Sequence, residues 1–98
     1  MQEQKIDINL TEEVAQGTYS NLAIITHSNA EFIIDFVSLM PGIPKGNVKS
    51  RIIMTPQNAK RLLNALADNI AKFEEKNGVI KESAMENIPI IGGNGGLA

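Results

Sequence analysis

The sequence predicts an α+β domain in which a three- or four-stranded antiparallel sheet has one long C-terminal helix packed on one face. Three observations favour this class: a hydrophobic hairpin pattern over residues 18–40, a third alternating segment at 48–54, and an amphipathic segment at 56–76. Consecutive strands followed by a helix are typical of α+β folds and not of alternating α/β folds. We expect one domain over residues 1–77, followed by a flexible glycine-rich tail over residues 78–98.

Composition restricts the classes of function. The chain has 98 residues, 43% of them hydrophobic and 20% charged, as expected for one globular domain. Its net charge of −2 creates no general attraction for nucleic acid or an anionic membrane. The absence of cysteine excludes disulfides, zinc thiolate sites and cysteine nucleophiles. We expect a cytoplasmic protein that is not an enzyme, with no cofactor, no metal and no membrane partner.

The N-terminal elements are short. Ile6, Ile8 and Leu10 alternate with polar residues, which favours a strand with one buried face. Thr11 then suits the N-cap of a single helical turn, and Gly17 is typical of its end.

The hairpin pattern follows, with strands expected at residues 18–26 and 31–40 and a polar turn between them. A two- or four-residue loop places odd positions of the first strand beside even positions of the second, so Ala23 and Ile25 share a face with Ile34 and Phe36. The opposite face is also apolar apart from one carboxylate, and carries Leu22, Ile24, Ile33, Asp35 and Val37. A hairpin with one face in water does not have this pattern.

Two prolines and two glycines make residues 41–47 a loop, because neither residue type sustains a sheet ladder. The third strand, at 48–54, places Lys49, Arg51 and Ile53 on one face. We therefore expect Arg51 or Lys49 to neutralise Asp35, because an unpaired carboxylate in an apolar strand is costly.

The helix from Pro56 to about Lys76 is the best-defined element. Thr55 suits its N-cap, Pro56 its first position and Gly78 its C-terminal stop. Its apolar residues have the three- and four-residue spacing of a single stripe: Ala59, Leu62, Leu63, Leu66, Ile70 and Phe73. The glycine-rich segment that follows lacks the Lys-Ser/Thr of a phosphate-binding loop, so we interpret it as a tail.

Candidate functional residues are few. His27 is the only histidine and has no neighbouring acid, so we expect a polar residue near the hairpin turn and no catalytic residue. Five of the nine basic residues could form a local patch for phosphates: Lys45, Lys49, Arg51, Lys60 and Arg61.

A set of short motifs closely resembles the bacterial family catalogued as domain of unknown function 3467. The motifs are Gln16-Gly17-x-Tyr19-x-Asn21, His27-Ser28-x-x-Glu31-Phe32-x-x-Asp35-Phe36, Pro41-Gly42, Arg51-Ile52-x-x-Thr55-Pro56 and Ala59-Lys60-Arg61-Leu62-Leu63. The resemblance covers Ile6 to about Asn77 and implies no established activity. The element order is also similar to that of the export chaperone family typified by SecB, although a shared fold does not establish a function.

One helix can cover only one face of a sheet that is apolar on both. We therefore expect a non-enzymatic, self-associating protein-binding module, chaperone-like or an accessory subunit, that forms a homodimer or higher homo-oligomer. Its second face would be the contact: Leu22, Ile24, Ile33, Asp35, Val37, Arg51 and Ile53. The alternative is a small nucleic-acid-binding protein that uses the basic patch. A weaker third hypothesis is an enzyme built around His27 and Asp35 at a subunit interface.

Overall fold

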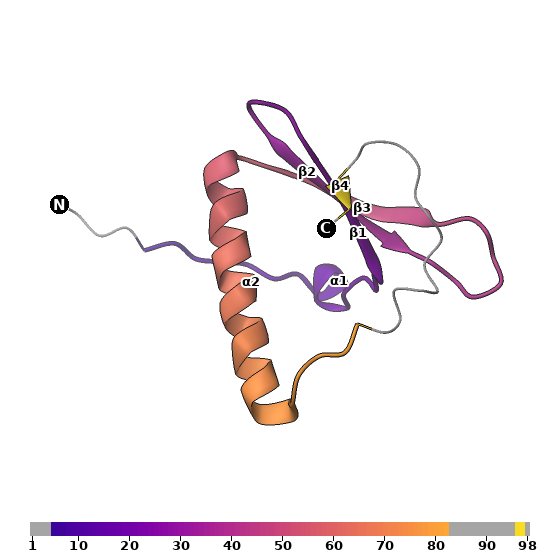
Figure 1. Ribbon diagram of the computed structural model, residues 1–98. Coiled ribbons are helices and arrows are strands. Elements are labelled where there is room, and N and C mark those ends of the chain that lie inside the picture. The colour runs from indigo at the N-terminus through magenta and orange to yellow at the C-terminus, as the bar shows by residue number, and fades with distance from the viewer. Residues whose placement is uncertain (1–4, 83–95, 98) are drawn as a thin grey trace.

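The computed structural model describes residues 5–82 and 96–97. The predicted α+β class, with an antiparallel sheet and a long C-terminal helix, is confirmed (Figure 1). The strands lie in the order β3-β2-β1-β4, and every pair is antiparallel. In chain order the elements are α1 (Glu12–Ala15), β1 (Leu22–His27), β2 (Phe32–Ser38), β3 (Asn47–Met54), α2 (Pro56–Asn77) and β4 (Gly96–Leu97).

Strands β1 and β2 form the predicted hairpin. Ala23 lies opposite Phe36 and Ile25 opposite Ile34, as the four-residue loop requires. Ser28 builds the turn, because its N–H donates to the Glu31 carbonyl at 2.9 Å and its hydroxyl oxygen accepts from two backbone N–H groups. The polar turn residues therefore set the register that gives each face its side chains.

Strand β1 begins at Leu22, later than the predicted start at residue 18, and Asn21 supplies the reason. Its side-chain amide donates to the Leu39 carbonyl at 3.0 Å and accepts from the Leu39 N–H at 2.8 Å. The side chain thus reproduces the two hydrogen bonds of a strand pair, while the backbone before it leaves the sheet.

Strand β3 pairs with β2 and contains a bulge. Phe36 lies opposite Ser50 and Val37 opposite Val48, so Lys49 is an extra residue on β3. The preceding loop packs closely: a Cβ on Gly46 would lie 2.6 Å from the Leu39 side chain and 3.0 Å from that of Val37. Glycine at this position allows the loop to cover Val37, which is only 4% exposed.

Both helices have the predicted ends. The hydroxyl oxygen of Thr11 accepts from the Val14 N–H at 3.2 Å in α1, and that of Thr55 accepts from the Asn58 N–H at 3.1 Å in α2. Gly17 and Gly78 follow the two helices with φ values of +80° and +92°, the left-handed region that glycine tolerates.

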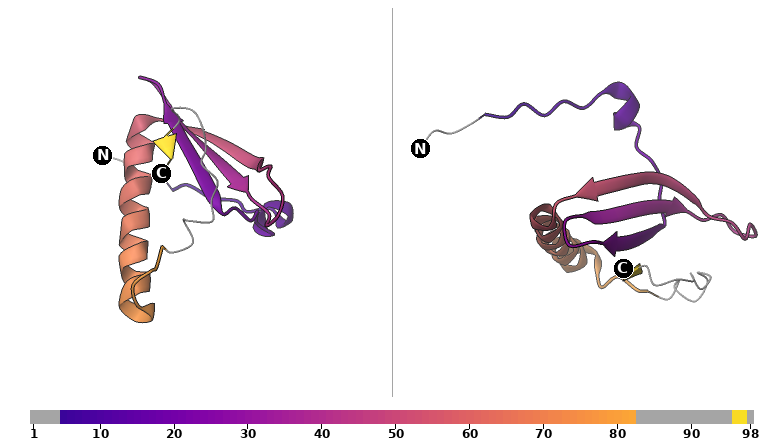
Figure 2. Two further views of the ribbon diagram at one scale, coloured as in Figure 1. Left: turned by 45° about the vertical axis from the view of Figure 1, so that its right-hand side comes forward. Right: turned by 90° about the horizontal axis from the view of Figure 1, so that it is seen from above.

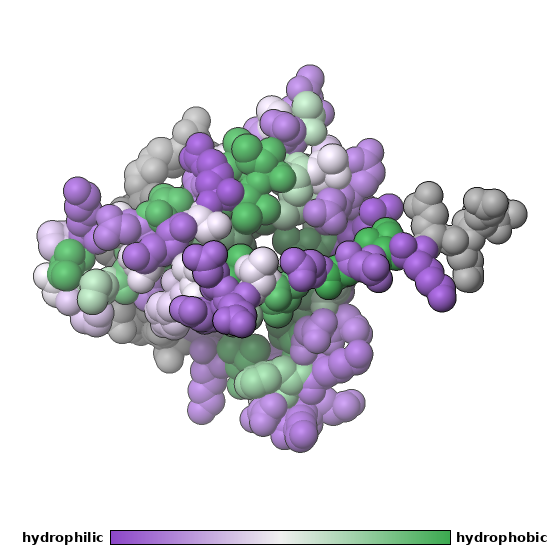
Figure 3. Space-filling view, turned by 180° about the vertical axis from the view of Figure 1, so that it is seen from behind, coloured by the Kyte–Doolittle hydropathy of each residue, from purple (hydrophilic) through white to green (hydrophobic). Residues whose placement is uncertain are grey.

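Helix α2 stands on one side of the sheet (Figures 1 and 2). Its apolar stripe is exposed. The exposed fractions of its residues are 41% for Leu62, 62% for Leu63, 54% for Leu66, 39% for Ile70 and 52% for Phe73. Figure 3 shows hydrophobic side chains reaching the surface in the middle of the view from behind, with hydrophilic residues around them. The helix therefore follows the sheet as predicted but does not close a core over it.

The two ends of the chain differ in whether they join the sheet. Residues 5–10, the N-terminal arm, do not join the described sheet, so the strand expected there is not paired. Near the other end, Gly96 and Leu97 of β4 pair with Ile25 and Ile24 of β1. Residues 83–95 and 98 lie outside the described part, and the flexibility expected of residues 78–98 stays a prediction.

Candidate functional site

The face of the sheet predicted for self-association is assembled by strand register. Leu22 lies opposite Val37 on β1 and β2, and Ile33 lies opposite Ile53 on β2 and β3. Alternation places Ile24 and the Asp35–Arg51 pair on this same face. The seven predicted residues, Leu22, Ile24, Ile33, Asp35, Val37, Arg51 and Ile53, thus form one surface, which we call the association face. Its role in association stays a prediction.

Exposure varies across the association face. Val37 is buried, Leu22, Ile24 and Ile33 are half-buried, and Ile53 is 55% exposed. The apolar surface available to a partner therefore lies mainly toward β3.

Asp35 and Arg51 lie opposite each other on β2 and β3 and form a bidentate ion pair. Arg51 Nε donates to Asp35 Oδ1 at 2.7 Å, and Nη2 donates to Oδ2 at 2.9 Å. The Asp35 side chain is 13% exposed, against 60% for Arg51. The hydrogen bond from Arg51 lowers the pKa of Asp35 and raises the pKa of Arg51 from their ordinary values. The predicted counter-charge is confirmed, and Arg51 supplies it.

This pair predicts a pH-dependent contribution to stability. Because the pKa of Asp35 is lowered on folding, its contribution is fully present above the unfolded value of about 3.9 and is lost as the pH falls through the folded value. We expect Asp35→Asn to be less stable than the native chain at pH ~7, with a difference that shrinks below pH ~4. Urea unfolding at several pH values measures this. Glu31→Gln, in the exposed turn, is the control, and a constant difference between pH ~7 and ~3 would contradict the prediction.

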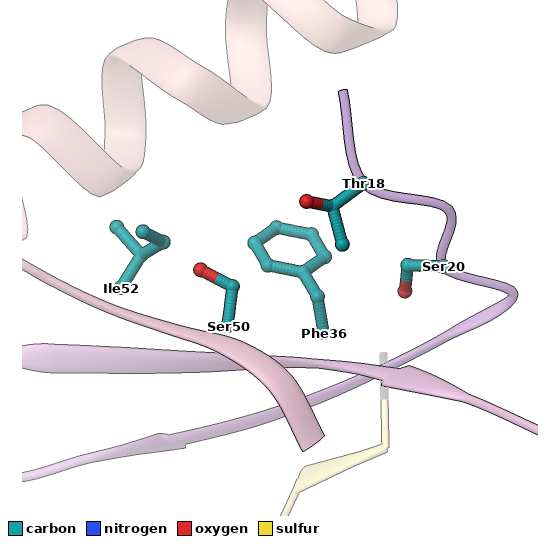
Figure 4. Close-up of a pocket in the computed structure, with 5 residues that line it drawn as sticks. All are labelled: Thr18, Ser20, Phe36, Ser50 and Ile52. Carbon is teal, nitrogen blue, oxygen red and sulfur yellow. The ribbon is translucent and has the colours of Figure 1, made fainter. Parts of the chain in front are cut away.

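The other face of the sheet carries a pocket on the side of α2 (Figure 4). Its volume is about 290 Å³, and Thr18, Ser20, Phe36, Ser50 and Ile52 line it. The Ser20 hydroxyl is 3.0 Å from both the Leu22 and Val37 carbonyl oxygens, which ties the segment before β1 to the sheet. Sequence reasoning missed this pocket. The available signal was the small polar residues that line it: Thr18 and Ser20 before β1, and Ser50 inside β3.

His27 does not share a site with Asp35 within one chain. The register places these two side chains on opposite faces, and the His27 ring stacks on Phe32 with 5.3 Å between centroids. In the part of the chain that the structure describes, no three His, Cys, Asp or Glu residues are grouped so that they could hold a metal ion.

The five basic residues are distributed along the fold. Lys45 precedes β3 and Lys49 lies at its bulge, whereas Lys60 and Arg61 follow its far end in α2. Arg51, between these groups, contacts Asp35. Strand β3 therefore separates Lys45 and Lys49 from Lys60 and Arg61. Nucleic-acid binding by these basic residues stays a prediction.

The fold and its surfaces define a small α+β domain with an antiparallel sheet, a detached amphipathic helix and an ion pair set in an apolar face. The family model described as "Protein of unknown function (DUF3467)" matches residues 1–82. The chain belongs to this family, as its motifs predicted. No curated protein and no solved structure gives a significant match. Neither helix of residues 5–82 combines the length and apolar character needed to cross a membrane.

Proposed function

We propose that this chain is a non-enzymatic, self-associating protein-binding module of the cytoplasm, chaperone-like or an accessory subunit of a complex. One observation carries the proposal. Among the residues that the structure describes, Ile34 and Val37 are the buried hydrophobic side chains, at 6% and 4% exposure. A domain of this size needs a larger buried apolar surface to offset the conformational entropy lost on folding.

The apolar surface that a single copy leaves uncovered is distributed over both layers. Helix α2 exposes its stripe, and β3 exposes Ile52 at 42% and Ile53 at 55%, on opposite faces of the sheet. Exposed apolar surface of this extent is typical of contacts with other protein chains. A second copy is the simplest partner, because each copy brings the same two apolar surfaces.

Assembly tests the proposal directly. We expect the full chain to be a dimer or larger oligomer by light scattering at micromolar concentration, and Ile53→Asp to weaken that assembly. The substitution would place an unpaired carboxylate in the apolar contact, which costs several kcal/mol in the order of magnitude typical of buried charges. A well-folded monomer at micromolar concentration would overturn the proposal.

Two control variants show which surface of the molecule forms the contact. Asn64→Asp adds the same charge to the polar side of α2 and is expected to leave assembly unchanged. Ile52→Asp makes the same change one residue along β3, on the face that carries the pocket. If Ile52→Asp disrupts assembly and Ile53→Asp does not, the contact lies on the pocket face and the association face is excluded.

A further inference from the structure

The N-terminal arm is a strand pattern without a described partner. Its alternating apolar residues Ile6, Ile8 and Leu10 are 76%, 90% and 66% exposed. Asp7 and Asn9 occupy the other side of the same pattern. An extended segment of this composition is stable only when its backbone groups are hydrogen-bonded and its apolar side is covered.

The chain after the arm directs it away from its own sheet. Thr11 caps α1 with an extended backbone at φ −73° and ψ 159°, and Gly17 closes the turn with φ +80°. In the view from above, the arm runs on the β3 side of the molecule, clear of the strands (Figure 2, right). The arm therefore extends from α1 away from the sheet.

Strand β3 offers a matching edge. It is the first strand in the order β3-β2-β1-β4, so no described strand pairs with its outer side. Beyond the bulge at Lys49, the stretch from Ser50 to Met54 is uninterrupted and equals Ile6–Leu10 in length. Free strand edges of this kind accept a further strand from another chain.

We infer that residues 6–10 of one copy add as a strand to the Ser50–Met54 edge of a second copy. This inference rests on the proposed self-association and adds to it a second contact, at the edge of the sheet rather than on the association face. Each copy supplies one arm and one edge, so reciprocal exchange between two copies closes a symmetric dimer.

The uncharged face of β3 selects the orientation of the arm, because the apolar side chains of the arm suit that face. Arg51 projects from the association face with 60% of its side chain exposed, whereas Ser50 and Ile52 lie on the opposite, uncharged face. Asp7 is therefore placed on the face of Arg51, and Ile6, Ile8 and Leu10 extend the apolar face beside Ile52. With the two stretches aligned end to end, Ile8 lies opposite Ile52 whichever direction the arm runs.

Disulfide trapping between two differently substituted chains tests this inference, and the chain has no cysteine of its own. An Ile8→Cys chain is mixed with a size-tagged Ile52→Cys chain and mildly oxidised. Paired strands bring opposite Cα atoms to about 4.5–5.5 Å, within the range of a disulfide. Pairing also raises the effective thiol concentration from micromolar to about millimolar, so we expect cross-linking on the order of a thousandfold faster than without pairing.

The control is Ile53→Cys, one residue along β3 with its side chain on the other face. Heterodimers with Ile52→Cys but not Ile53→Cys support the inference. Equal cross-linking of both, or an intramolecular disulfide in the Ile8→Cys/Ile52→Cys chain, would overturn it. Light scattering of the native chain separates the two proposals: an oligomer without the specific cross-link overturns arm exchange alone, and a folded monomer overturns self-association as well.

Discussion

The apparent free energy of unfolding, per mole of dimer, is expected to rise by about 1.4 kcal/mol for each tenfold increase in protein concentration, if the folded form is a dimer. The physical reason is that the described residues of one copy bury little apolar surface, with Ile34 and Val37 as the buried hydrophobic side chains. In the proposed assembly a second copy supplies the remaining burial, so folding and association are expected to form one transition.

Chemical unfolding followed by circular dichroism over about two decades of concentration measures this dependence. The midpoint is expected to move to higher denaturant as the concentration rises. Asn64→Asp is the matched control, since it changes a polar position of α2 and is expected to show the same slope. An identical midpoint at every concentration would show that one copy folds alone.

A charge in the α2 stripe is expected to have the second large effect. Leu66 is 54% exposed, and burying a leucine side chain at an interface contributes roughly 1.5–3 kcal/mol. We expect Leu66→Asp to weaken association by roughly ten- to a hundredfold for each copy of the contact. Helical content is expected to fall with it, because a helix in a protein gains most of its stability from packing of its apolar face.

Sedimentation and far-ultraviolet circular dichroism measure the two consequences of Leu66→Asp. Asn64→Asp is the comparison, because both substitutions add one carboxylate to the same region of α2, whereas only Leu66→Asp changes the apolar stripe. Equal association of the two variants would exclude the stripe as a contact.

Local patterns were sufficient to predict most of the fold. The Thr55-Pro56 start and the Gly78 stop were correct because capping depends on neighbouring residues alone. The hairpin register was also correct, because loop length and alternation determine it. A basic partner for Asp35 on the third strand was also predicted, as Arg51 or Lys49, and the pairing of β3 with β2 places Arg51 opposite it.

The structure differs from the sequence predictions where tertiary contacts determine the local conformation. The Asn21 side chain makes the two hydrogen bonds that a paired strand residue would make with its backbone. Strand propensity does not reveal this substitution, so β1 was predicted to begin too early. The pocket beside Ser50 depends on where the segment through Ser20 crosses the sheet. Amphipathicity identified the stripe of α2 but not what covers it, because the same pattern suits contact with its own sheet or with another copy.

If the association face binds a partner as proposed, the ion pair between Asp35 and Arg51 would make that binding selective. The Asp35 side chain is only 13% exposed. An apolar partner that drew Arg51 away would therefore leave the Asp35 carboxylate buried without a counter-ion. Generic hydrophobic surfaces are thereby penalised, whereas a surface that leaves the pair intact or offers its own cation is accepted. Two charges that cancel each other would thus restrict which proteins could bind the proposed association face.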